Sequence, residues 1–167
     1  MKSYSQAELE ALTTCPKEIA DPPRKEMRSE QGSKRNDMLL RSADGQHEFS
    51  VFMRVSESFP EDFSIGLVYI PKDEPGSIML LRCNGPHGEL EGTFDITHSH
   101  FLCHLHKAKA ENIAAGARPE KGGEPTDKYA SFEQALPFFL KLVNLSEAND
   151  IMPHQQQLGL ELYPEGK

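Results

Sequence analysis

The sequence predicts an α+β fold: an antiparallel meander sheet of about five strands, with a C-terminal helix packed on one face and a short N-terminal helix. Three observations indicate this class. Apolar and polar residues alternate in several runs between positions 37 and 84, which is the period of a half-buried strand. Short Gly- or Pro-containing links join these runs and favour antiparallel neighbours. Helical spacing of apolar residues returns at 132–143.

The first 36 residues are expected to form an N-terminal helix and a flexible linker. Ser5 and Glu8 match a capping box, which predicts a helix over about 6–14. Residues 16–36 contain prolines, a glycine and many charges but little apolar periodicity, a composition typical of a linker. The remaining segment, 37–167, is expected to be a single α+β domain, large enough to bury a core.

Five strands are predicted in the first two thirds of this domain. The first two flank the dipeptide Asp44-Gly45, which is a hairpin signal. A Gly-rich turn near residue 85 precedes the fifth. The predicted strands span Met38–Arg41, Phe49–Val55, Phe63–Ile70, Ser77–Cys83 and about 93–106.

Residues 111–128 are rich in Gly, Pro and charge and are expected to form a long loop. Ser131 and Gln134 resemble a second capping box before the C-terminal helix. Pro137 lacks a backbone donor, so a kink or a late helix start is expected. Leu158–Tyr163 is one more candidate strand.

Composition narrows the function classes. The net charge of -8 argues against a protein that coats nucleic acid, because phosphate neutralisation needs clustered Lys and Arg. Residues 1–60 hold 9 basic and 10 acidic side chains, whereas 61–167 hold 9 and 16. The basic residues between 24 and 35 are more typical of a solvated segment than of an anion site. Three widely spaced cysteines and the lack of a long apolar run lead us to expect a cytoplasmic protein with no membrane span.

Four of the seven histidines occupy even-numbered positions within nine residues: His98, His100, His104 and His106. In a strand, side chains alternate faces, so all four imidazoles are expected on one side. A rise of about 3.3 Å per residue separates the Cα atoms of His104 and His106 by roughly 6.6 Å, whereas His98 and His106 lie roughly 26 Å apart. All four therefore cannot share one site.

The candidate site consists of His87, His104 and His106 with Arg82. One hypothesis is a metal site formed by the three histidines, holding a divalent metal such as zinc. The other is acid/base chemistry without metal, in which one imidazole is the general base, another the general acid, and Arg82 or Arg54 stabilises charge on a phosphoryl group. A third interpretation, given even weight, is a solvated polar face with Phe101, Cys103 and Leu105 on the apolar side.

One stretch resembles a family of small bacterial and phage-borne domains of unknown function. The resemblance covers roughly Gln46 to Leu145. It is carried by Leu80-Leu81-Arg82-Cys83-Asn84-Gly85-Pro86-His87, by His104-Leu105-His106, and by Ala135-Leu136 leading to Phe139-Leu140. It implies a role for the Asn-Gly-Pro-His turn and the His-Leu-His pair, and no activity. His98 and His100 are not part of its pattern, which favours His87, His104 and His106.

Three functions follow from these patterns. The first is a hydrolase acting on a phosphodiester such as RNA, of the kind found in toxin or defence modules. The second is a non-catalytic acidic binding or inhibitor protein of phage or bacterial origin, whose partner presents a basic surface. The third is a metal-binding protein.

Overall fold

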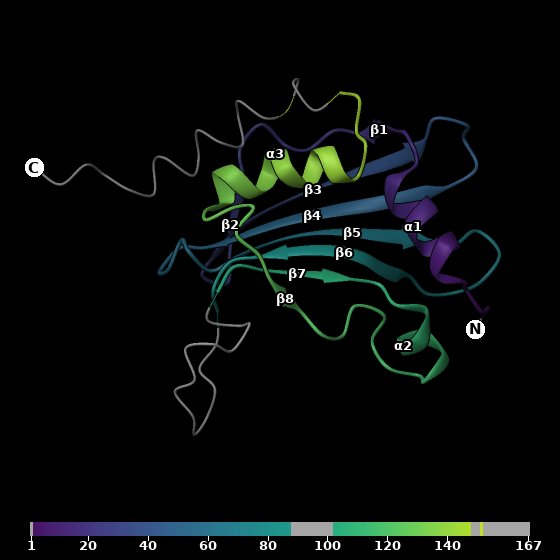
Figure 1. Ribbon diagram of the computed structural model, residues 1–167. Helices are drawn as coiled ribbons and strands as arrows, with labels where there is room; N and C mark the ends of the chain where they lie inside the picture. Colours follow the sequence, from purple (N-terminus) through teal and green to yellow (C-terminus); the bar gives the residue numbers. More distant parts are fainter. Residues whose placement is uncertain (1, 88–101, 148–150, 152–167) are drawn as a thin grey trace, which may run out of the picture.

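The computed structural model describes residues 2–87, 102–147 and 151, and these ranges form an eight-stranded antiparallel sheet with three helices (Figure 1). The α+β class is confirmed, whereas the predicted number of about five strands is too low. The strand order is β1-β3-β4-β5-β6-β7-β8, and β2 also pairs with β3. The strands are β1 Lys17–Asp21, β2 Arg28–Glu30, β3 Ser33–Ser42, β4 Glu48–Ser56, β5 Phe63–Ile70, β6 Ile78–Asn84, β7 His104–Lys107 and β8 Glu124–Pro125; the helices are α1 Gln6–Thr14, α2 Ala110–Ala114 and α3 Phe132–Leu142.

The segment 16–36, predicted to be irregular, contains β1, β2 and the start of β3. Both short strands lie at the edge of the sheet, where most of their side chains are exposed. They therefore lack the apolar alternation that marks a strand in sequence. Gln31 and Gly32 have φ angles of 51° and 77°, which suit a tight hairpin turn between β2 and β3.

From β3 to β8 each strand pairs with the next strand along the chain. Strands β4, β5 and β6 match three predicted runs, and β3 extends further toward the N-terminus than predicted. Of the fifth predicted strand, β7 lies within the described residues, whereas 93–101 and the candidate strand Leu158–Tyr163 lie outside them. The predicted loop 111–128 contains most of α2 and the two-residue strand β8.

The helices begin where the sequence indicates. At α1, Glu8 N–H donates to Ser5 Oγ at 3.1 Å and Ser5 N–H donates to the Glu8 carboxylate at 2.7 Å, so the predicted capping box is present. Helix α3 starts at Phe132 and continues through Pro137, so the predicted late start is wrong. Its cap differs from a full capping box, because Gln134 Oε1 accepts from Ala130 N–H at 2.9 Å.

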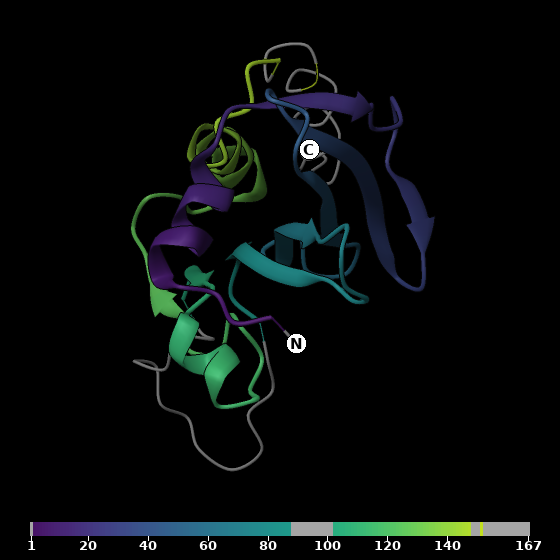
Figure 2. The ribbon, with the colours of Figure 1, turned by 90° about the vertical axis from the view of Figure 1, so that its right-hand side faces the viewer.

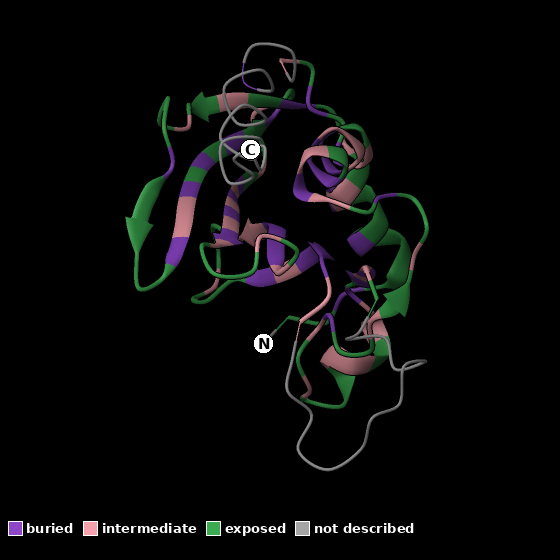
Figure 3. Cartoon of the chain, turned by 90° about the vertical axis from the view of Figure 1, so that its left-hand side faces the viewer, coloured by how far each residue is buried: buried purple, intermediate pink, exposed green. Residues whose placement is uncertain are grey.

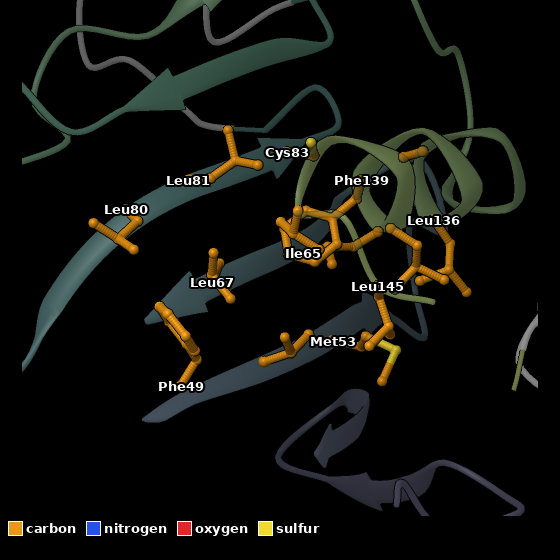
Figure 4. Close-up of a cluster of buried hydrophobic side chains, with 14 of the residues drawn as sticks. Phe49, Met53, Ile65, Leu67, Leu80, Leu81, Cys83, Leu136, Phe139 and Leu145 are labelled. Atoms are coloured by element: carbon orange, nitrogen blue, oxygen red, sulfur yellow. The ribbon is translucent and has the colours of Figure 1, made fainter. Parts of the chain in front are cut away.

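Helix α3 covers one face of the sheet, with α1 on the same side (Figure 2). Burial alternates along β4 and along most of β3, and Figure 3 shows such alternation as bands of colour on the strands. Apolar side chains of β4, β5 and β6 meet α3 in the core, where Ile65 lies close to Phe139 (Figure 4). The alternate residues of these strands therefore point to the face that α3 does not cover.

A buried lysine contacts the C-terminal ends of both α1 and α3. Lys17 is 1% exposed, and its Nζ donates to the carbonyl oxygens of Thr13, Cys15 and Val143 at 2.8, 2.9 and 3.0 Å. The ammonium also lies 4.7 Å from the centroid of the Phe49 ring. Thr13 lies in the last turn of α1, Cys15 is the C-cap of α1, and Val143 is the C-cap of α3. This one cation therefore satisfies carbonyl groups at the C-terminal ends of both helices.

Candidate functional site

Two rows of residues cross the sheet on the face opposite α3. Directly opposed residues of paired strands point to the same face, so the strand register fixes which side chains come together. The first row runs Arg35, Arg54, Ser64, Asn84 and His104, and the second runs Phe52, Gly66, Arg82 and His106.

His104 and His106 share one face of β7, as the alternation predicts, and both are buried, at 0% and 3% exposure. The interpretation of a solvated histidine face is therefore wrong for this pair. Cys103 and Leu105 are only partly buried, because β7 lies near the edge of the sheet. His98, His100 and Phe101 lie outside the described residues.

Backbone carbonyls fix the orientation of both buried imidazoles. The Nδ1 atom of His104 lies 2.8 Å from Leu102 O, and the Nδ1 atom of His106 lies 3.0 Å from Glu120 O. A carbonyl oxygen only accepts, so each Nδ1 carries a proton. In the neutral ring the lone pair is then on Nε2, which makes Nε2 the reactive nitrogen of both histidines.

His87 joins His104 through a cluster of three side chains. The two Nε2 atoms are 3.2 Å apart, and Asn84 Nδ2 lies 3.3 Å from each of them. Ser64 donates its hydroxyl proton to Asn84 Oδ1 at 2.7 Å and so orients the amide. Tyr129 donates to His104 O at 2.7 Å. Strands β5, β6 and β7 thereby hold the turn residue His87 against the sheet.

The face opens into a cleft of about 730 Å³. Its lining includes His87 and His106 but not the fully buried His104, which contacts the cleft through His87. The lining is rich in cations although the chain as a whole is acidic. The charged residues of the lining are Arg35, Arg54, Asp62, Arg82, Arg118 and Lys121.

Among the described residues of this lining, Asp62 is the only carboxylate, and it is already paired because it lies 2.7 Å from Arg54. Glu120, which is 5% exposed, lies 3.9 Å from Arg82. Burial lowers the pKa of Arg82 below its ordinary value, with Glu120 opposing that effect and Arg118 and Arg54 adding to it. In the part of the chain that is described, the buried Nε atoms of Arg35 and Arg82 have no hydrogen-bond partner. The cleft is therefore suited to an anion.

Gly123 lets the chain lie directly over the two imidazoles. A Cβ atom at this position would lie 2.8 Å from Cε1 of His106 and 3.0 Å from Cδ2 of His104. Any side chain would therefore displace a ring or the loop. The Glu120 carbonyl that holds His106 belongs to the same loop, so residues 118–123 both cover and orient the imidazole.

Within 2–87, 102–147 and 151, no group of three or more His, Cys, Asp or Glu side chains is arranged to hold a metal ion. The metal site of His87, His104 and His106 stays a prediction. The same three histidines and Arg82 do lie together, although they come from β6, β7 and the turn after β6.

The sequence did not identify several residues of this site. The sequence places Arg35 in a segment that is predicted to be solvated, and Arg118 and Lys121 in a predicted loop, with no role indicated for them. Asn84 is part of the recognised Asn-Gly-Pro-His turn, but only the strand register places its amide beside two imidazoles. Alternation within β3, β4 and β5 indicates which face of its strand each of Arg35, Arg54 and Ser64 occupies. Only the pairing of the strands shows that the three residues are neighbours.

Comparison of the chain with protein-family models, with curated proteins and with solved structures found no match. The resemblance described above therefore stays a prediction. In the described part of the chain, no helix is long and apolar enough to cross a membrane.

Proposed function

We propose that the cleft binds a phosphodiester of RNA and cleaves it with His87 and His106 as the acid/base pair. The observation that carries this proposal is the convergence of two imidazoles and five basic side chains on one cleft of an acidic chain. Such a cleft attracts an anion, and imidazoles are the groups best suited to transfer protons near neutral pH.

Apart from the water of the second step, the chain and the substrate supply every group that this chemistry needs. Nε2 of neutral His106 accepts the proton of a ribose 2′-hydroxyl, whose oxygen attacks the adjacent phosphorus. The P–O5′ bond breaks, and protonated His87 gives a proton to the departing O5′. The products are a 2′,3′-cyclic phosphate and a free 5′-hydroxyl. Water then opens the cyclic phosphate with the roles of the two imidazoles reversed, which completes the hydrolysis.

The other site residues position these groups. His104 Nε2 is an acceptor in its neutral ring, so it holds the Nε2–H of His87 and leaves Nδ1 of His87 to carry the transferred proton. Arg82 stabilises the negative charge that develops on the phosphoryl oxygens. Arg35, Arg54, Arg118 and Lys121 bind the flanking phosphates.

The test is cleavage of a single-stranded RNA oligonucleotide by the full chain in the presence of EDTA. Loss of one acid/base group should lower the rate by about 10²- to 10⁴-fold, so we expect this loss in His87→Ala and in His106→Ala. His47→Ala is the matched control, because His47 contacts Tyr69 away from the cleft. A substrate with a 2′-deoxyribose at the cleaved position should resist cleavage. Equal rates in wild type and both site variants would refute the proposal.

A metal-dependent site is the second candidate. Two nitrogen ligands of a tetrahedral zinc, each bound at about 2.0–2.1 Å, lie roughly 3.3–3.4 Å apart, close to the 3.2 Å between Nε2 of His87 and Nε2 of His104. This function predicts stoichiometric metal in wild type by mass spectrometry and its loss in His104→Ala. Cleavage that EDTA abolishes and zinc restores would favour it over the metal-free mechanism.

A further inference from the structure

An aromatic ring lines the basic cleft. Phe52 of β4 is the first residue of the second row; it lines the cleft and is only partly buried. Its position depends on Gly66, the residue directly opposite on β5. A Cβ atom at Gly66 would overlap the Phe52 ring at Cε1 and Cζ. The missing side chain at Gly66 therefore allows the ring to lie across the neighbouring strand.

Cations flank this ring on two sides. Arg54 follows Phe52 by two residues on β4, so the two Cα atoms are about 7 Å apart on the same face. Arg82 stands on β6, directly beyond Gly66. A flat apolar surface with a guanidinium on either side matches a nucleotide, whose base is aromatic and whose phosphates are anionic.

We propose that Phe52 is a base-stacking platform, and that the substrate of the cleft is single-stranded nucleic acid with one unpaired base on this ring. The inference deepens the proposed function, since it names the form of the RNA that the same cleft binds. A base within a duplex is stacked between its neighbours and cannot reach the ring unless it is extruded. The platform thus selects unpaired nucleotides, and it positions the phosphate next to the bound base near Arg82 and His106.

Equilibrium binding tests the platform apart from catalysis. The protein is the full-length His106→Ala chain, which binds but should not cleave, and the probes are a fluorescent uridine pentanucleotide and the same backbone with abasic residues. Base stacking on an aromatic side chain supports affinity differences of about 5- to 150-fold. We expect a Phe52→Leu replacement to weaken binding of the pentanucleotide by that factor and to leave the abasic probe unchanged.

Two further variants separate the ring from general damage to the cleft. Gly66→Ala keeps the ring but displaces it, and should reproduce the loss, whereas Phe52→Trp should retain affinity. Phe59→Leu is the matched control, because Phe59 is 70% exposed and does not line the cleft. Three results would overturn the platform. The first is that Phe52→Leu binds both probes as tightly as the parent chain does. The second is that Phe52→Leu loses the same factor of affinity for the two probes. The third is that the parent chain binds a duplex as tightly as the single-stranded probe. Base-dependent binding without cleavage in the chain with native histidines would refute the hydrolase and leave the platform standing.

Discussion

Replacing Gly123 by alanine should impair the site without removing any functional group. The new Cβ atom would lie 2.8 Å from Cε1 and 2.9 Å from Nε2 of His106, whereas ordinary contacts begin at 3.4 Å. The ring or the loop must therefore shift by about 0.6 Å. A misplacement of about 1 Å can cost roughly 100-fold in rate, so we expect kcat/KM for RNA cleavage to fall by roughly ten- to 100-fold.

The control variant is Gly116→Ala, which introduces a side chain at a φ of 70° with nothing within 4 Å of its Cβ. It should lower stability by about 1–2 kcal/mol through backbone strain and leave cleavage unchanged. Urea denaturation of both variants separates the two effects. A Gly123→Ala protein that cleaves RNA at the wild-type rate, with unchanged imidazole NMR signals, would refute the close packing of this loop on the histidines.

Four further predictions concern the fold and the imidazoles. Lys17→Met leaves three carbonyls, one of them buried, without their donor. It should lower the free energy of unfolding in urea by about 3 kcal/mol, compared with under about 0.5 kcal/mol for the exposed Lys25→Met; equal stability of the two would contradict the role of Lys17. Burial lowers the pKa of Lys17 below its ordinary value of 10.5. Between the pKa of the folded chain and 10.5, the unfolded chain therefore binds more protons than the folded chain. In this pH range the free energy of unfolding should rise with pH more in wild type than in Lys17→Met. Ser5→Ala removes one half of the capping box and should cost about 1 kcal/mol, seen as a lower Tm; an unchanged Tm would count against it. Long-range ¹H–¹⁵N NMR at alkaline pH should show His104 and His106 as Nδ1–H tautomers, and an Nε2–H signal from either would contradict the carbonyl contacts.

Local sequence patterns predict the central elements of this fold, because each of these elements carries its own signal: apolar alternation in a strand or a capping box at the start of a helix. Burial alternates along β4, large apolar residues recur at every second position of β5 from Phe63 to Tyr69, and the capping box at Ser5 starts α1. The edge strands β1 and β2 escaped prediction because their backbones pair with β3 while their side chains stay largely in solvent. Their place in the sheet comes from long-range pairing, which leaves little trace in the composition of residues 17–30.

The residues of the candidate site also fall into two groups: those that the pattern of one strand predicts and those that depend on how strands pair. Alternation along one strand predicts that His104 and His106 share a face. The contribution of Arg35 depends on the register of β3 against β4, which pairs it with Arg54. No property of the residues near position 35 specifies that register, so the basic cleft became visible only in three dimensions.

The two rows that form the cleft draw on five consecutive strands, from Arg35 on β3 to His106 on β7, and the loop at 118–123 covers them. Ribosomes synthesise the chain from its N-terminus, so a nascent chain can build the sheet up to β6 without possessing a complete cleft. On the proposed function, competence to bind RNA would therefore arise late in synthesis, after residue 123 has emerged. Fragments that end before this loop should fail to bind nucleic acid even if their strands pair.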